Sequence, residues 1–362
     1  MPRRSEQRPV HLEGGSPMST LSRRLGLLAG AAALAIAALP ASAADVTLKL
    51  ADSLPAGHSI TKNATHFFFD RVKTLAGGKV EFQHFPAEQL GKAKDLLSVT
   101  QTGLADIGYI VPSYVSEKMP LGAVAELPGG FASSCEGAKA FWSLAKPGGL
   151  LDTLEFKPNG VRVLYVVALS PYQAVFSEKA GFKSFDDFKG RKIRSNPGPM
   201  ELGLRNLGAV PIRMTPPEIF DAMTKGTIDG ALLPFTSTVS YSLDKVVKSS
   251  TIGQNFGTVG ITYSINLNKW NALPKDVQDA LTKAGDETVS HACARFDTEE
   301  GELAKKLQSE GVLMVKFTPE QEKILANNFD EVSKDWAANL QKRGKPADKV
   351  LEAFRAAIAA QR

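Results

Sequence analysis

The stretch that decides the fold is KIRSNPGPMELGLRNLGAVPIRMTPPEIFDAMTKGTIDGALLP, residues 192–234. Within it the strand-like runs KIRS, PIRM and TIDGALLP alternate with the helical patterns MELGLRNLG and PEIFDAMTKG. The same alternation begins at VTLKLAD (46–52) and continues through VRVLYVVALS (161–170). Strands that alternate with helices are typical of an α/β protein, so we expect mainly parallel sheets.

The C-terminal third has a different pattern. From Pro274 it is almost entirely helical, and one strand-like run, GVLMVKF (311–317), interrupts it. Residues 274–311 predict a single helix about 57 Å long, which is longer than one domain is wide. Because a chain of 362 residues is also too long for one compact core, we expect two lobes that this helix bridges.

The N-terminus has the pattern of a secretory signal peptide. Arg23 and Arg24 precede the apolar run LGLLAGAAALAIAAL (25–39), and PASA follows. A run of about 15 residues is shorter than a membrane-spanning helix needs. We therefore expect residues 1–43 to be removed after Ala43 and the mature protein to be exported; the alternative is a helix that stays attached as an anchor.

The charge balance excludes one class of partner. The chain holds 43 basic and 38 acidic residues, and residues 1–43 contribute five Arg and two Glu, which leaves 38 and 36 in the mature chain. A body this close to neutral is not that of a nucleic-acid-binding protein.

The two cysteines, Cys135 and Cys293, lie 158 residues apart, and their spacing indicates no geometry. An oxidising compartment permits a disulfide. We favour the other interpretation, two separate buried side chains.

Motifs for catalysis are weak. GHSIT (57–61) has a threonine where a nucleophile elbow needs its second glycine, so Ser59 is predicted to be a helix N-cap rather than the nucleophile of a secreted hydrolase. His58 and His66 could face one another, but a turn residue and a surface residue are favoured, and no metal-binding spacing is present. The acidic pairs 186–187 and 299–300 are expected on solvated helix surfaces. The sequence predicts neither an enzyme nor a cofactor.

Arg194 is the strongest candidate for binding. It ends the strand-like run KIRS beside the turn NPGP (196–199). A guanidinium presents a planar fork of donors that matches a carboxylate, and a strand end places it at a cleft. The alternative is a surface arginine in an ion pair with Glu201 or Asp187.

Several ordered motifs resemble the solute-receptor subunit of tripartite ATP-independent periplasmic (TRAP) transporters, the dicarboxylate-receptor-like family. The matching stretches are FDDFKGRKIRSNPG (185–198), LGAVPIRMTPPEIFDAMTKGTIDG (207–230), PAEQLG (86–91) and LNKWNALPKDVQDAL (267–281). The resemblance implies a two-lobed periplasmic binding protein fold with hinge strands and a long helix that bridges both lobes. Lobe I would hold residues 44–170 and roughly 259–298, and lobe II roughly 171–258 and 299–362.

The resemblance also implies that Arg194 holds a substrate carboxylate when the lobes close. This chain departs from the better-known members, because Gln173, Leu233 and Val111 stand where those have charged or polar contacts. We therefore expect a monocarboxylate with an apolar or aromatic body. Besides these four residues, the predicted lining contains Asn196, Tyr109, Phe131, Phe235 and Phe256.

The resemblance implies an exported, periplasmic receptor that captures an organic acid and delivers it to the membrane permease subunits. The alternative is a periplasmic sensor that signals to a membrane kinase. A monomer and a homodimer are both open.

Overall fold

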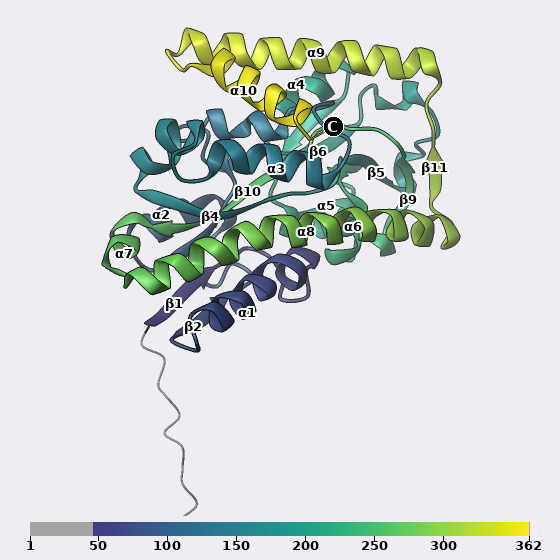
Figure 1. Cartoon of the computed structure of the whole chain (residues 1–362). Helices are drawn as coiled ribbons and strands as arrows, with labels where there is room; N and C mark the ends of the chain where they lie inside the picture. The colour runs from purple at the N-terminus through teal and green to yellow at the C-terminus, as the bar shows by residue number, and fades with distance from the viewer. Residues whose placement is uncertain (1–45, 362) are drawn as a thin grey trace, which may run out of the picture. The chain divides into compact units, whose positions relative to one another are not determined.

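The structure, a computed structural model, describes residues 46–361, and the predicted signal peptide lies outside them. Two sheets organise this part of the chain (Figure 1). The first contains, in spatial order, β2 (Val80–Phe85), β1 (Val46–Ala51), β3 (Ile107–Ile110), β10 (Gly260–Asn266) and β4 (Val161–Ala168). The second contains β11 (Leu313–Val315), β9 (Val247–Thr251), β5 (Gln173–Ser177), β8 (Gly230–Leu233), β6 (Lys192–Ser195) and β7 (Val210–Arg213).

One strand in each sheet runs against the others. β10 pairs antiparallel with β3 and β4, and β5 pairs antiparallel with β8 and β9, whereas the remaining pairs are parallel. The chain enters β5 directly from β4 and enters β10 directly from β9, so it changes sheets at these two strands. Strands joined through helices are parallel, because such a crossover returns the chain to the same edge. The prediction of mainly parallel sheets is confirmed.

The helices pack around the two sheets. They are α1 (His66–Leu75), α2 (Leu96–Gln101), α3 (Ser134–Ala145), α4 (Pro199–Asn206), α5 (Ile219–Lys225), α6 (Phe235–Ser240), α7 (Leu267–Ala272), α8 (Lys275–Ser309), α9 (Pro319–Lys342) and α10 (Ala347–Ala359). Between residues 46 and 361 no helix has the length and apolar character needed to cross a membrane.

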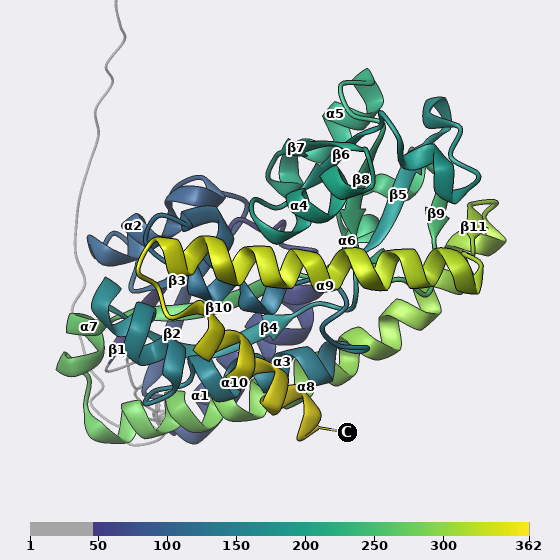
Figure 2. The same cartoon turned by 90° about the horizontal axis from the view of Figure 1, so that it is seen from above.

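α8 is the long helix that the sequence predicts, with 35 residues. It packs against β4, α3 and α1 on the side of the first sheet and against α6 on the side of the second (Figure 2). At Gly285 the helix approaches β4 so closely that an added Cβ would lie 2.0 Å from the carbonyl oxygen of Leu164. The prediction of a single helix that bridges both sheets is confirmed.

The last two helices pack on different neighbours. α9 lies against α4, where Asn328 donates to the carbonyl oxygen of Gly203 (3.0 Å). α10 packs on α3, and the ring of Phe354 meets the ring of Phe131. All strands of each sheet fall inside the ranges predicted for one lobe, whereas α10 packs beside the first sheet; the lobe limits themselves stay a prediction.

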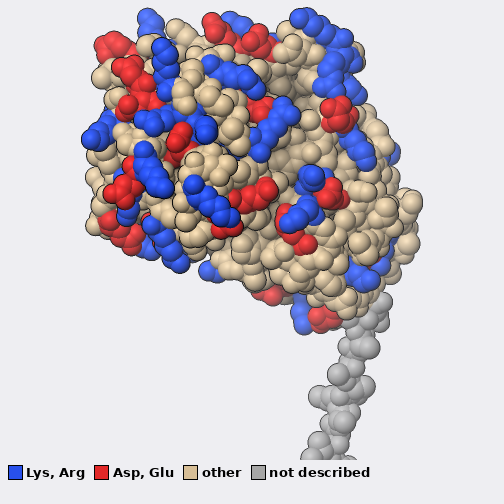
Figure 3. Space-filling model, turned by 180° about the vertical axis from the view of Figure 1, so that it is seen from behind, with Lys and Arg blue, Asp and Glu red and all other residues tan. Residues whose placement is uncertain are grey.

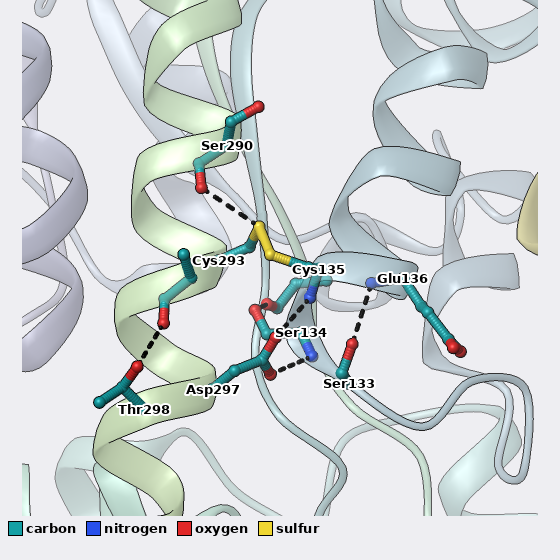
Figure 4. Close-up of a disulfide and its surroundings, with 10 residues drawn as sticks. Ser133, Ser134, Cys135, Glu136, Ser290, Cys293, Asp297 and Thr298 are labelled. Atoms are coloured by element: carbon teal, nitrogen blue, oxygen red, sulfur yellow. Dashed lines mark hydrogen bonds between the residues drawn. A yellow bond between two sulfur atoms is a disulfide. The ribbon is translucent and has the colours of Figure 1, made fainter. Parts of the chain in front are cut away.

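The structure corrects the expectation for the cysteines. Cys135 in α3 and Cys293 in α8 form a disulfide, with their Cα atoms 4.7 Å apart (Figure 4). Beside it the carboxylate of Asp297 accepts hydrogen bonds from the backbone N–H groups of Ser134 (2.6 Å) and Cys135. Residues far apart in sequence thus hold the start of α3 against the long helix.

Two further expectations were wrong. Glu299 and Glu300 do not lie on a solvated face, because both carboxylates bind other segments: Glu299 accepts from the Ser59 hydroxyl (2.5 Å), and Glu300 from the backbone N–H groups at the start of α6. Ser59 is not an N-cap acceptor either. Its hydroxyl donates to Glu299, and His58 Nδ1 accepts from Ile60 N–H (3.1 Å) instead.

Candidate ligand-binding site

Arg194 lies at the end of β6 with no exposed surface. Its guanidinium donates to four neutral oxygens: the carbonyl oxygens of Met214 (2.8 Å) and Leu232 (3.3 Å), the Asn196 side chain (2.7 Å) and the Tyr114 hydroxyl (3.4 Å). Among residues 46–361 no carboxylate forms an ion pair with it. Arg194 is also the one buried Lys or Arg side chain in that range.

The alternative of a surface ion pair is therefore wrong. Glu201 binds Arg213 on the neighbouring strand, with 2.5 Å between Oε1 and Nε. Asp187 accepts from the backbone N–H groups of Lys183 and Ser184, which lowers the pKa of its carboxyl. Both carboxylates are engaged away from the guanidinium.

A buried carboxyl group, that of Glu126, is linked to the guanidinium through one intervening side chain. Asn196 accepts from Arg194 through Oδ1 and donates through Nδ2 to Glu126 Oε2 (3.1 Å). Burial raises the pKa of Glu126 to about 8, although Ser113, Asn196 and the charge of Arg194 oppose part of that rise. Near pH 7 Glu126 is therefore neutral in the folded protein, and it does not balance the charge of Arg194.

Tyrosines surround this arrangement. Burial raises the pKa values of Tyr114, Tyr172 and Tyr241, and the positive charge of Arg194 opposes the rise in each. Tyr109, on β3, meets Tyr263 edge to face with 5.7 Å between ring centroids, and its pKa is raised by burial and then by Tyr114 and Tyr241. Each of these tyrosines therefore lies close enough to Arg194 or to another of them for their charges to interact.

The site residues come from the carboxyl ends of strands in both sheets. His58 follows β1, Tyr114 follows β3 and Tyr172 follows β4 in the first sheet. Asn196 follows β6, and Tyr241 follows β8 and α6 in the second. Ligands of open α/β sheets bind at the carboxyl ends of strands, so the chain topology alone brings these side chains to one place.

A groove lies beside this place. It has a volume of 370 Å³ and is lined by Tyr114 and Met214, which both accept hydrogen bonds from Arg194. Lys92, Lys94 and Arg213 lie on the same groove. Glu218 lies on it too, and Lys92 and Arg213 are paired with Glu88 and Glu201, so the groove carries charges of both signs. On the face shown in Figure 3, basic and acidic side chains are also interspersed.

Other predicted lining residues have different surroundings. The Gln173 side chain donates through Nε2 to the carbonyl oxygen of Gln254 (2.6 Å). Its Oε1 accepts from the backbone N–H of Gln254 (3.3 Å) and from the Thr251 hydroxyl. Phe256 packs on Phe188 and Phe329. Phe131 and Phe235 line a separate pocket of 460 Å³. Val111 is buried directly before the helical turn that contains Tyr114. Leu233 is buried opposite Gln173 in the second sheet.

Four participants escaped the sequence analysis: Glu126, Tyr114, Tyr172 and Tyr241. One signal could have found two of the tyrosines. The chain has six Tyr, and the segments VPSY (111–114) and SPYQ (170–173) each place one within two residues of a proline that follows a strand. A rare, amphipathic side chain at the carboxyl end of a strand is a candidate for ligand contact. Nothing in the sequence distinguishes Glu126 from an exposed glutamate.

Comparison with known proteins agrees with this geometry. The model of the family described as bacterial extracellular solute-binding protein, family 7 (DctP), matches residues 50–339. The chain belongs to this family. The resemblance to TRAP solute receptors is therefore confirmed, and this solute-binding protein has their two-lobed α/β fold.

Its relatives bind organic acids. The C4-dicarboxylate-binding periplasmic protein DctP of Rhodobacter capsulatus is 29% identical over 291 residues, which cover 75% of this chain and 81% of that protein. A TRAP solute-binding protein from Rhodoferax ferrireducens, solved with benzoate, superposes with a TM-score of 0.79 at 24% identity, covering 87% of this chain and 98% of the other. One from Bordetella bronchiseptica, solved with mandelate, gives 0.78 at 24% identity, with 88% and 100% covered.

Proposed function

We propose that this solute-binding protein captures the anion of an organic acid at Arg194 and delivers it to the permease subunits of a TRAP transporter. One observation carries the proposal. Arg194 is a fully buried cation whose hydrogen-bond partners are all neutral. A buried charge without a counter-charge costs several kcal/mol, and a bound carboxylate supplies that counter-charge.

Contacts between the two sheets link ligand capture to closure. Tyr114, which follows a strand of the first sheet, accepts from Arg194 on the second, and Asn196 donates to Glu126 in the same way across the sheets. When the two sides meet, water is excluded and the pairing of guanidinium and carboxylate strengthens. The cost of removing both charges from water offsets part of this gain.

The environment of Arg194 favours a monocarboxylate with an aromatic or apolar body. Within residues 46–361 a single Lys or Arg side chain is buried, so the site balances one buried carboxylate. Tyr109, Tyr114, Tyr172 and Tyr241 supply aromatic surface around it, and Asn196, Val111 and Leu233 stay in the proposed lining. Benzoate and mandelate, found in two similar structures, belong to this class, whereas the C4-dicarboxylates bound by the Rhodobacter relative carry a second charge.

The proposed location is the periplasm. The signal-peptide pattern of residues 1–43 supports export, and the matched family is extracellular. We propose a receptor without catalytic activity or cofactor; among residues 46–361 no cluster of three or more His, Cys, Asp and Glu side chains is placed to hold a metal ion.

Thermal unfolding of the purified protein against a panel of mono- and dicarboxylates tests the proposal. A ligand at one hundred times its Kd stabilises the folded state by about 2.7 kcal/mol, which is visible as a shift in the midpoint. Arg194→Ala and Arg194→Met, which keeps more of the packing, are expected to lose the shift. Arg205→Ala, an exposed arginine on α4, is the control and should keep it.

The binding free energy lost in the Arg194 variants is expected to be several kcal/mol, because one partner of a buried charged pair is removed. Unchanged affinity in these variants would reject the role of Arg194. A shift with dicarboxylates alone would keep the receptor function and reject the proposed ligand class.

A further inference from the structure

His58 has a buried donor that the protein itself does not use. The residue follows β1 and is 1% exposed. Its Nδ1 accepts a hydrogen bond from the backbone N–H of Ile60 at 3.1 Å. Its Nε2 is buried and has no hydrogen-bond partner in the part of the chain that the structure describes.

The Ile60 contact decides the tautomer of the ring. A neutral imidazole has one nitrogen that accepts and one that donates. Because Nδ1 accepts from Ile60, the proton is on Nε2, on the side of the ring away from the helix start. Burial also lowers the pKa of His58 to about 3, so the ring is uncharged at neutral pH. His58 therefore offers one N–H donor and no charge.

The position of His58 is at the junction of the two sheets. Its ring meets the ring of Tyr241 edge to face, with 4.9 Å between centroids. The next residue, Ser59, donates from its backbone N–H to the Ser240 hydroxyl at 3.2 Å. Tyr241 is one of the tyrosines whose pKa the charge of Arg194 affects. The His58 ring thus contacts one of the tyrosines around Arg194.

Unused hydroxyl groups accompany it. Among the described residues, the hydroxyls of Tyr109, Tyr172 and Tyr241 form no hydrogen bond and, unlike His58 Nε2, are not buried from water, whereas the Tyr114 hydroxyl binds Arg194. Burying polar groups without partners costs free energy, so such a group at a binding site indicates a partner on the ligand. Here one group can only donate, and the hydroxyls can donate or accept.

We propose that His58 Nε2–H donates to an uncharged oxygen on the solute, such as a hydroxyl or keto oxygen, while Arg194 holds its carboxylate. The inference rests on the proposed function and narrows the ligand class to hydroxy- or oxo-substituted carboxylic acids. A second carboxylate does not fit this end of the site, because a neutral imidazole and phenols do not balance its charge.

Matched pairs of acids test the proposal by calorimetric titration of the full-length purified protein. The pairs are benzoate with 3- or 4-hydroxybenzoate, and phenylacetate with mandelate. The wild type is expected to bind the hydroxylated member of at least one pair about 10- to 100-fold more tightly, because the unsubstituted acid leaves the donor buried and unpaired.

His58→Asn is designed to keep the helix start, since an asparagine oxygen accepts the Ile60 N–H as an N-cap. It is expected to remove the preference within each pair. His66→Asn, an exposed histidine on α1, is the matched control and should keep the preference. Arg194→Ala should no longer bind either acid of each pair.

The outcomes separate the two proposals. Equal affinity within every pair for the wild type, or an equal loss for both members in His58→Asn, would reject the role of His58 and leave the proposed function standing. Failure of all four acids to bind would reject the aromatic ligand class and, with it, the role of His58.

If His58→Asn does not fold, the wild type labelled with ¹⁵N-histidine gives the answer. The buried Nε2–H resonance should move downfield with mandelate or hydroxybenzoate and not with the unsubstituted acids. A shift of equal size with both would overturn the proposal.

Discussion

The charges of the groups around the proposed ligand site depend on pH. The chain of contacts runs from Arg194 through Asn196 to Glu126, and only the arginine is charged near pH 7. If Glu126 ionised, it would compete with a bound carboxylate for the same positive charge. In the proposed function, the burial of Glu126 therefore leaves the guanidinium for the solute anion.

The pKa of Glu126 predicts how stability depends on pH. Its value is about 8 in the folded protein against 4.5 in the unfolded chain. Between pH 6.5 and 8 the folded state holds a proton that the unfolded state has lost, so the free energy of unfolding rises as the pH falls through this window. His58, whose pKa is lowered from 6.5 to about 3, is neutral in the folded state and loses its remaining proton in the unfolded chain just above pH 6.5, an opposite and smaller effect that is the same with or without Glu126.

Glu126→Gln should reduce this dependence. The contribution of one proton is about 1.4 kcal/mol per pH unit, or about 2 kcal/mol over the window. Urea unfolding of wild type and variant at pH 6.5 and 8 measures it. Glu155 and Glu300, whose pKa values burial raises to about 7, keep their share in both proteins. Identical pH slopes would mean that Glu126 is ionised in the folded state.

The sequence predicted the position of Arg194 at a strand end but gave no sign of Glu126. An arginine at the end of a strand-like run is visible in KIRS, and the lone turn NPGP after it indicates the strand end. The neutral state of Glu126 depends on burial by segments such as that of Asn196, 70 residues away. Desolvation by distant residues leaves no local pattern.

Among the elements, α8 joins segments beside both sheets. Asp297, Glu299 and Glu300 lie within one turn and accept hydrogen bonds from the starts of three other helical segments, near residues 134, 59 and 235. Negative charge at a helix start interacts favourably with the unpaired N–H groups there. The long helix therefore positions both the His58 segment and α6, which leads to Tyr241.

Replacement of two glycines of α8 by alanine is expected to change stability in opposite directions. In a helix, alanine is favoured over glycine by about 1 kcal/mol. At Gly301 nothing lies within 4 Å of an added Cβ, so Gly301→Ala should stabilise the protein by up to that amount. At Gly285 the Cβ would lie 2.0 Å from the Leu164 carbonyl oxygen, so Gly285→Ala should destabilise it by about 1–3 kcal/mol.

Thermal or urea unfolding of the two variants checks both signs in one helix. If Gly285→Ala were as stable as Gly301→Ala, the close approach of α8 to β4 would be wrong. The periodicity of residues 274–311 predicts the helix, but the point at which it crosses β4 follows only from the packing.

At the scale of the whole molecule, the disulfide closes a loop across a sequence separation of 158 residues. Both cysteines belong to helices, α3 and α8, that pack on β4. The bond therefore cross-links elements beside the first sheet and does not join the two sheets. Cross-links of this kind stabilise mainly by constraining the unfolded chain, typically by about 2–4 kcal/mol.

The double variant Cys135→Ser/Cys293→Ser should lose about that amount in urea unfolding, with its affinity for the solute unchanged. Reduction of the wild type with dithiothreitol serves as the control and should give the same loss, with no effect on the variant. A lower affinity in the variant would mean that the bond also constrains closure.

The sequence by itself determined the order and type of the elements, the single long helix, the α/β class and the arginine at a strand end, because each depends on local periodicity or on one residue at a turn. Only the tertiary structure decided the disulfide, the reversed strands β5 and β10, the caps by Glu299 and Glu300, and the neutral groups around Arg194. These features depend on which distant segments come together and exclude water. The charge state and the free hydrogen-bonding capacity of a buried side chain are properties of that environment.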